Sequence, residues 1–165
     1  MLFRSLHYCS VNNLPCLFII ENNEFSVYTD LKSRQNRTSI KSKVEGFNVN
    51  YELCNNHDFN YLYNIWGESL TRAKNGLGTH VIEIMTHRYR EHCGPNFDDN
   101  LKYRNKEFLS KWKSIDIINL LVKDLLAVQI NSDKVDAINK EIDKTISVSF
   151  EKSRNLYIQS KSLIF

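Results

Sequence analysis

LFIIENNEFSVYT, residues 17–29, is the stretch that decides the fold. Residues 16–21 form a run that is apolar on both faces, which is typical of a central strand in a parallel sheet covered on two sides. The run ends at Asn22 and Asn23, and neither asparagine is followed by the glycine of a tight hairpin turn. We therefore predict a buried strand whose carboxyl end leads into a polar loop.

The rest of the chain alternates between strand and helix before it becomes helical. A second apolar run, Val81–Thr86, predicts another strand, and a weaker strand is expected within residues 47–53. Helical spacing of apolar residues predicts helices at residues 2–10, 58–74, 104–113, 116–128 and 133–158. This order indicates an α/β fold with right-handed parallel crossovers, in which a parallel sheet flanked by helices (about residues 1–103) precedes a helical C-terminal segment (about residues 104–165).

Two of these helices have apolar sides that we expect to be buried. Asp58 is predicted to cap the helix that ends at Lys74. The buried side of this helix is expected to consist of Phe59, Leu62, Trp66, Leu70 and Ala73. A core stripe is expected along the last helix at Val135, Ile138, Ile142 and Ile146.

Composition is ordinary for a soluble globular protein. The 165 residues are 42% hydrophobic and 25% charged, with a net charge of +3, which allows one domain with a real core. No apolar run approaches the roughly 18 residues that span a bilayer, and we recognise no signal peptide. The four cysteines form no C-x-x-C pair, so we expect reduced thiols and a cytoplasmic location.

Polar clusters follow the two strong strands at the positions where α/β sheets bind ligands. The first is Asn22–Phe25, which offers a side-chain amide oxygen and backbone carbonyls of the kind that magnesium accepts. The second is Thr86–His92, whose guanidinium and imidazole groups suit phosphate oxygens. Its donors are His87, Arg88, Arg90 and His92. Together the clusters suggest a magnesium-bound diphosphate held between two strand ends.

Each cluster also has a simpler interpretation, which the residues alone leave open. Paired asparagines after a strand are common in turns, because asparagine tolerates left-handed backbone and bonds to its own chain. A loop rich in arginine and histidine is commonly a solvated surface. A separate basic stretch at residues 31–44 raises the alternative of nucleic-acid binding, through Lys32, Arg34, Arg37, Lys41 and Lys43. We expect no nucleic-acid partner, because that stretch lacks interleaved aromatic residues.

Three stretches resemble the alpha subunit of the thiamine-diphosphate-dependent 2-oxo-acid dehydrogenases. NLPCLFIIENNEFSVYT (residues 13–29) is similar to the family pattern N-L-P-x-x-F-x-x-E-N-N-x-Y-x-x-x-T. GTHVIEIMTHRYREHCGPNFD (residues 78–98) is similar to G-P-x-L-I-E-x-x-T-Y-R-Y-x-x-H. YRNKEFLSKWKSIDIINLL (residues 103–121) resembles the segment that follows in the family. The order and spacing agree across nearly the whole chain.

The resemblance implies a thiamine-diphosphate-binding fold and a set of site residues. It implies that Asn23 ligates magnesium through its side chain and that Phe25, which replaces the usual tyrosine, does so through its carbonyl oxygen. It implies that Arg88 and His92 contact the diphosphate of the cofactor. It also implies a catalytic role for His92 in handling the substrate. The implied reaction is that of an oxidoreductase, in which a pyruvate-like 2-oxo acid is decarboxylated and the acyl group passes to a lipoyl disulfide.

The chain departs from the family in one important respect. The family completes its magnesium site with the aspartate of a G-D-G motif, and this chain has no such motif. The chain is therefore expected to be the C-terminal half of the domain and incomplete alone. The expected partners are a beta-type subunit, a lipoyl-bearing acyltransferase and possibly a chain that supplies the missing half. The alternative function is that of a non-catalytic remnant that acts as a subunit-interaction module. The location that the resemblance implies in a eukaryote is the mitochondrial matrix.

Overall fold

Three parallel strands form the main sheet, as predicted. They are β1 (Leu17–Asn22), β4 (Asn50–Cys54) and β5 (His80–Met85), and their spatial order is β1-β5-β4. β5 is the central strand and buries Val81, Ile82 and Glu83. The prediction that the first strand is central is wrong for the described residues, because β1 lies at an edge of this sheet and alternates between half-buried and exposed positions.

The computed structural model describes residues 2–36, 39–55 and 57–162, so that Arg37 of the basic stretch lies outside the described residues. The chain divides into two compact units, of which the first ends at Ile117 and the second begins at Ile118. Helix α5 (Lys106–Ser114) belongs to the first unit together with the sheet. The predicted site residues Asn23, Phe25, Arg88 and His92 all lie in this first unit.

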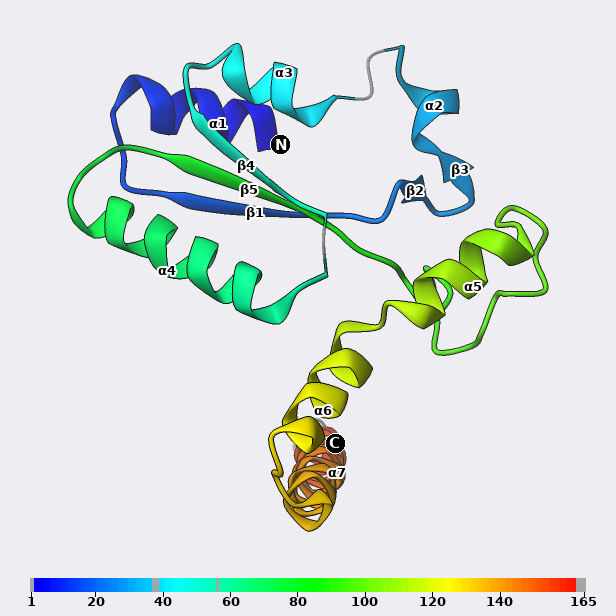
Figure 1. Cartoon of the computed structure of the whole chain (residues 1–165). Helices are drawn as coiled ribbons and strands as arrows, with labels where there is room; N and C mark the ends of the chain where they lie inside the picture. Colours follow the sequence, from blue (N-terminus) through cyan, green and yellow to red (C-terminus); the bar gives the residue numbers. More distant parts are fainter. Residues whose placement is uncertain (1, 37–38, 56, 163–165) are drawn as a thin grey trace. The chain divides into compact units, whose positions relative to one another are not determined.

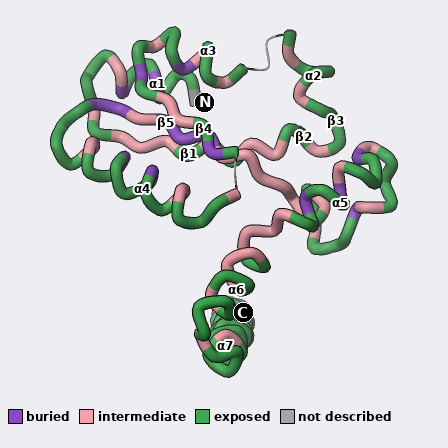
Figure 2. Tube along the Cα trace, viewed as in Figure 1, coloured by how far each residue is buried: buried purple, intermediate pink, exposed green. Residues whose placement is uncertain are grey.

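Helices cover both faces of the sheet (Figure 1). α1 (Leu2–Val11) and α3 (Ile40–Glu45) lie on one face, where Leu6 and Val44 pack with Val49 and Val81. α4 (Phe59–Lys74) lies on the other face, where its Ile65 packs with Cys54 and Ile82. The buried residues gather along the sheet and on the helix sides that face it (Figure 2). The predicted α/β class is therefore confirmed.

The predicted start of α4 is confirmed, but its predicted buried side is not. Asp58 caps the helix by accepting hydrogen bonds from the backbone N–H groups of Asn60 and Tyr61 over 2.8 and 3.2 Å. The buried residues of the helix are Ile65 and Ser69. Three of the residues predicted to be buried are instead exposed: Phe59, Trp66 and Leu70. The helix has apolar residues on more than one side, so that docking through Ile65 leaves a second apolar side uncovered.

A short hairpin and helix follow the end of β1. β2 (Phe25–Ser26) pairs antiparallel with β3 (Thr29–Asp30), with Phe25 opposite Asp30. α2 (Leu31–Arg34) begins directly afterwards, and the side chain of Asp30 accepts a hydrogen bond from the backbone N–H of Ser33. The hairpin occupies the region beyond the carboxyl end of the main sheet (Figure 1), which is the region where the sequence places a site.

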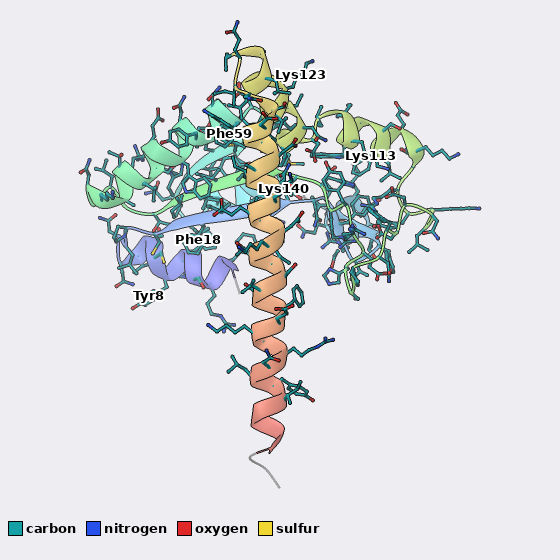
Figure 3. The ribbon with its side chains drawn as sticks, turned by 90° about the horizontal axis from the view of Figure 1, so that it is seen from below. Tyr8, Phe18, Phe59, Lys113, Lys123 and Lys140 are labelled. Atoms are coloured by element: carbon teal, nitrogen blue, oxygen red, sulfur yellow. The ribbon has the colours of Figure 1, made fainter. Side chains whose placement is uncertain are left out.

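The second unit consists of α7 (Ser132–Ser162) and nearly all of α6 (Ile117–Ala127). The predicted helices are confirmed, but the expected core stripe of α7 is not. Ile138, Ile142 and Ile146 are each about half exposed. Figure 3 shows α7 as a single long helix, with Lys140 labelled on it. Within the described residues, no helix is both long enough and apolar enough to cross a membrane.

Candidate functional site at the carboxyl ends of β1 and β5

The two polar loops predicted from the sequence begin side by side. β1 and β5 are parallel neighbours, and Asn22 lies opposite Met85 at their carboxyl ends. The backbone N–H of Thr86 donates to the Asn22 carbonyl oxygen over 3.0 Å, which carries the pairing one residue beyond the strands. The expectation of two neighbouring strand ends is thereby confirmed, and both loops leave the sheet where α/β folds bind their ligands.

Hydrogen bonds from side chain to backbone build the loop Asn22–Phe25. Asn22 Oδ1 accepts from the Glu24 N–H over 2.9 Å, and Asn23 Oδ1 accepts from the Phe25 N–H over 3.0 Å. Glu24 has a φ of 63°, in the left-handed region that such turns favour. The turn interpretation therefore describes the local geometry of both asparagines. The amide oxygen of Asn23 has two lone pairs, and the turn bond uses one of them.

The side chain of Phe25 anchors the loop to the rest of the site. Its ring packs edge-on against Tyr103, with ring centroids 5.3 Å apart, and against Phe108, with centroids 5.8 Å apart. Such edge-to-face pairs are favourable beyond the apolar area that they bury. The ring thus holds the backbone of residue 25, whose carbonyl oxygen is the predicted ligand atom.

Arg88 reaches from the loop after β5 to the loop after β1. Its Nη2 atom donates to the Val27 carbonyl oxygen and to Tyr103 Oη, each over 3.2 Å. The same atom lies 3.6 Å from the Asp98 carboxylate. Only 20% of the Arg88 side chain is exposed. The structure therefore brings the guanidinium to the hairpin that follows Asn23, where protein acceptors surround it.

A buried ion pair fixes the loop that carries Arg88. The Asp98 carboxylate pairs with Arg104, and the two side chains are 1% and 2% exposed. Asp98 also accepts from Tyr103 Oη over 2.6 Å, while Arg104 Nη1 donates to the Arg88 carbonyl oxygen over 2.7 Å. Asp98, Tyr103 and Arg104 were not among the site residues predicted from the sequence. The dipeptide Tyr103-Arg104 stands within a stretch that resembles the family, and that position was the available signal.

His87 does not join the polar cluster, contrary to the expectation that it adds an N–H donor near neutral pH. Its ring stacks on Trp112, with centroids 5.6 Å apart, and also contacts Phe108. Burial, reinforced by the positive charge of Arg104, lowers the pKa of His87 to about 4. Arg104 Nη1 lies 3.4 Å from His87 Nε2, so that the ring nitrogen that faces Arg104 is an acceptor. His87 is therefore a neutral packing residue at pH 7.

The exposed part of the second cluster is formed by His92 and Arg90. His92 is exposed, so that an incoming ligand can reach its imidazole. The Arg90 guanidinium carbon lies 3.6 Å from the centroid of the Phe97 ring, and Nη1 donates to the Pro95 carbonyl oxygen over 2.9 Å. Arg90 therefore stabilises its own loop by a cation–π contact and a hydrogen bond.

The residues of the first cluster match a magnesium site only in part. Asn23 and Phe25 offer neutral oxygen ligands, which suit a hard cation when a carboxylate completes the set. The nearby Glu83 carboxylate is buried and already bound to Asn22 and Tyr51, whereas the Glu24 side chain is exposed. No group of three or more histidine, cysteine, aspartate or glutamate residues that could hold a metal exists among the described residues.

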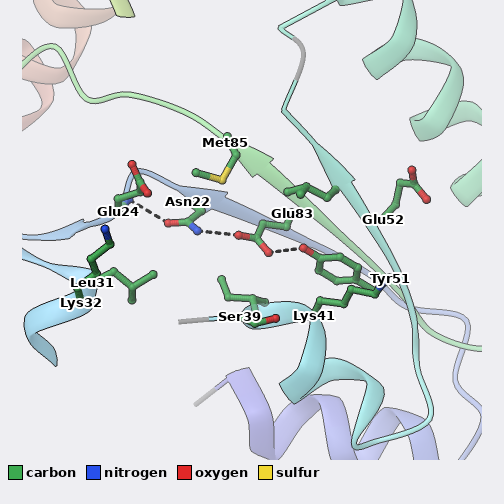
Figure 4. Close-up of a pocket in the computed structure, with 12 residues that line it drawn as sticks. Asn22, Glu24, Leu31, Lys32, Ser39, Lys41, Tyr51, Glu52, Glu83 and Met85 are labelled. Carbon is green, nitrogen blue, oxygen red and sulfur yellow. Dashed lines mark hydrogen bonds between the residues drawn. The ribbon is translucent and has the colours of Figure 1, made fainter. Parts of the chain in front are cut away.

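A cavity of about 550 Å³ opens beside the first cluster, on the α3 side of the sheet (Figure 4). Glu83 and Tyr51 lie at its floor, and Asn22 and Glu24 line one end. Lys32 and Lys41 from the basic stretch contribute further lining. Tyr51 was missed by the sequence analysis, because nothing in its local sequence indicates that it faces a strand 32 residues away.

These features define an α/β fold with a partial ligand site at the ends of two adjacent parallel strands. The family model of the Dehydrogenase E1 component matches residues 1–161, and the chain belongs to this family. The resemblance seen in the motifs is therefore confirmed.

Curated relatives of the chain are alpha subunits of 2-oxo-acid dehydrogenases. The pyruvate dehydrogenase E1 component subunit alpha of Rickettsia typhi is 26% identical over 164 residues, which are 99% of this chain and 49% of that protein. The 3-methyl-2-oxobutanoate dehydrogenase subunit alpha of Mycobacterium tuberculosis is 27% identical over 114 residues, 69% of this chain and 30% of that protein. The pyruvate dehydrogenase E1 component subunit alpha of Bacillus subtilis is 26% identical over the same length. The chain spans about half the length of these relatives or less.

Proposed function

We propose that this chain is one part of the alpha subunit of a thiamine-diphosphate-dependent 2-oxo-acid dehydrogenase. In that role it contributes to the oxidative decarboxylation of a pyruvate-like 2-oxo acid and to acyl transfer to a lipoyl-bearing acyltransferase. The observation that carries the proposal is the parallel pairing of β1 with β5, since it brings the Asn22–Phe25 loop and the Arg88 loop together. The family membership of residues 1–161 supports the same reaction class.

Each predicted site residue has a part in this function. Asn23 Oδ1 and the Phe25 carbonyl oxygen would contribute neutral ligands to magnesium. Arg88 would place a cationic fork beside the diphosphate, and His92 would meet the diphosphate and the substrate from an exposed position. When bound, thiamine diphosphate supplies the electron sink for loss of carbon dioxide. The chain's own residues bind and orient that group.

A second polypeptide is proposed to complete the site, because the chain lacks the G-D-G aspartate that completes the magnesium site in the family it resembles. The proposed partners are a chain that supplies the missing half of the subunit and a beta-type subunit. The proposed location is the cytoplasm, or the mitochondrial matrix in a eukaryote.

Isothermal titration calorimetry with magnesium and thiamine diphosphate tests this function. The chain alone is expected to bind the cofactor weakly or not at all. The chain together with the amino-terminal half of a relative's alpha subunit and its beta-type subunit is expected to bind it and to decarboxylate a 2-oxo acid. Submicromolar binding by the isolated chain would contradict the proposed incompleteness. An assembled complex that binds no cofactor would contradict the function itself.

The alternative function is a non-catalytic subunit-interaction module. The uncovered apolar side of α4 favours it, because this side borders an open cavity of about 500 Å³ and is rich in aromatic residues. Its main members are Phe59, Leu62, Tyr63, Trp66 and Leu70. Co-purification with a beta-type subunit, combined with absence of decarboxylase activity in the assembled complex, would favour this alternative.

A further inference from the structure

Glu83 is a buried carboxylate that links all three strands of the main sheet. It lies on the central strand and is only 5% exposed. Its Oε1 atom accepts from Asn22 Nδ2 of β1 over 2.6 Å, and its Oε2 atom accepts from Tyr51 Oη of β4 over 2.5 Å. Figure 4 shows the three side chains joined in a row across the cavity floor. We call this arrangement the Tyr51–Glu83–Asn22 clamp.

The strand register explains how both donors reach one carboxylate. Glu83 lies opposite Ile20 of β1 and opposite Leu53 of β4. Asn22 is two residues beyond Ile20, and Tyr51 is two residues before Leu53, so both donors approach along diagonals of the sheet. Because alternate residues of a strand share a face, all three side chains of the clamp project from the same face.

The clamp determines which way the Asn22 amide faces. With its Nδ2 group bound to Glu83, Asn22 must turn Oδ1 toward the following loop, where it accepts the Glu24 N–H over 2.9 Å. That bond holds Glu24 at its left-handed φ, and Asn23 Oδ1 then accepts the Phe25 N–H. The hydrogen bonds therefore run without a gap from Tyr51 to the loop that presents Asn23.

A carboxylate is a costly choice for a purely structural position in this core. Burying an ionised group is unfavourable unless it is hydrogen-bonded, and apolar residues of similar size commonly serve stability as well or better. Glu83 is nevertheless the charged residue on its face of β5, where its neighbours along the strand are the apolar residues Val81 and Met85. Burial, together with the bond to Glu83, raises the pKa of Tyr51, so that the phenol stays protonated and continues to donate.

We propose that Glu83 is a positioning residue, held by Tyr51, that fixes the Asn22 amide and thereby the conformation in which Asn23 and Phe25 are presented to a ligand. The statement that the Asn22–Phe25 loop binds a ligand rests on the function proposed above. The clamp itself is a property of this chain and can be tested without any ligand.

The test uses Tyr51→Phe, which removes one hydroxyl group and keeps the ring, together with Glu83→Gln. The matched control is Tyr61→Phe, because Tyr61 Oη also donates to a carboxylate, that of Glu52, over 3.1 Å, but lies outside the clamp. The measurements are the NMR signals of the Asn22 side-chain amide and the hydrogen-exchange rates of backbone amides in the full chain. The Ile82 amide in β5 reports on unfolding of the sheet as a whole.

In Tyr51→Phe, we expect the Asn22 side-chain signals to shift and the Glu24 amide to exchange about tenfold faster, the change that corresponds to loss of about one hydrogen bond. The Ile82 amide is expected to change much less, and Tyr61→Phe is expected to leave Asn22 and Glu24 as in the parent chain. Unchanged Asn22 and Glu24 signals in Tyr51→Phe would overturn the proposal. Equal acceleration at Glu24 and Ile82 would also overturn it, since the effect would then be loss of stability alone. If Glu83→Gln does not fold, Tyr51→Phe still decides the outcome, and neither variant depends on cofactor binding.

Discussion

Tyr103 donates a hydrogen bond from its Oη to the Asp98 carboxylate over 2.6 Å, and the same carboxylate forms a buried ion pair with Arg104. The carbonyl oxygen of Arg88 is bound by Arg104, and the guanidinium of Arg88 contacts Tyr103. The position of the predicted diphosphate-binding arginine is therefore set by residues that come 10 to 16 positions later in the chain.

Asp98→Asn is expected to destabilise the chain by about 3 kcal/mol, because it removes the closer and fully buried one of the two carboxylates that pair with the buried Arg104. Urea unfolding followed by tryptophan fluorescence measures the change, since Trp112 lies in the same unit. The control is Asp99→Asn, at a carboxylate that is about one third exposed, pairs with the solvent-facing Lys113 over 2.9 Å and lies farther from Arg104, at 3.6 Å. We expect that control to cost less than about 1 kcal/mol. Equal losses in the two variants would contradict the importance of the buried pair.

Stability is expected to fall as the pH is lowered from about 6.5 to about 4, because of His87. The folded chain holds the pKa of His87 at about 4, below the value of about 6.5 in an unfolded chain, so the unfolded state binds more protons in this range. The stabilisation that His87 contributes to the folded state is present in full above pH 6.5 and is lost as the pH approaches 4. Because the ring is only partly buried, we expect roughly 1–2 kcal/mol after allowance for solvent screening.

The pH dependence can be assigned to His87 by comparing unfolding midpoints across this range in His87→Phe and in His92→Phe. His87→Phe is expected to flatten the slope, whereas the same change at the exposed His92 is expected to preserve it. Some slope will remain in His87→Phe, because burial also lowers the pKa of His57 and of His80. An identical slope in His87→Phe and the parent chain would show that His87 is not responsible.

Val27→Asn is expected to preserve stability or to raise it by about 0.5–1 kcal/mol. Val27 has a φ of 56°, and a β-branched residue is strained there, whereas asparagine tolerates this conformation. The main-chain carbonyl that accepts from Arg88 is retained in the variant. Thermal unfolding measures the effect against Val11→Asn, at an exposed position at the end of α1. A loss above about 1 kcal/mol would mean that packing of the Val27 side chain outweighs the backbone strain.

Arg88→Ala is expected to weaken thiamine diphosphate binding by about tenfold or more in the assembled complex, since a charge-assisted contact to phosphate is lost. Arg90→Ala is the matched control, because that guanidinium is held against Phe97 and Pro95 in its own loop. Calorimetry on both complexes measures the difference. Equal effects of the two substitutions would remove Arg88 from the proposed site, and circular dichroism on each variant checks that the fold is retained.

The elements with strong local signals were predicted correctly from the sequence. The apolar runs of β1 and β5 and the capping residue Asp58 needed no tertiary information, because strand burial and helix capping act over a few residues. The side by which α4 docks was not predictable in this way. Apolar residues surround much of that helix, and Ile65 faces the sheet because it packs against Cys54 and Ile82.

The candidate site was predictable as a pair of loops but not as a set of contacts. The family motifs marked Asn23 and Arg88, and the strand order explains why their loops are neighbours. The clamp joins Tyr51 to Glu83 only because β4 and β5 pair in one particular register, which no local pattern encodes. His87 was misjudged because its polarity suggested solvent, whereas Trp112 and Phe108 enclose its ring.

The position of β1 at the border of its sheet has a consequence for how a second polypeptide can join this chain. Within the described residues, β5 is the sole partner of β1 in the sheet, so the opposite side of β1 offers backbone groups for strand addition. A newcomer aligned parallel to β1 would finish beside Asn22, and its last side chains would arrive next to the amide oxygen of Asn23. Strand addition along β1 would thus bring the end of a second polypeptide to the Asn22–Phe25 loop.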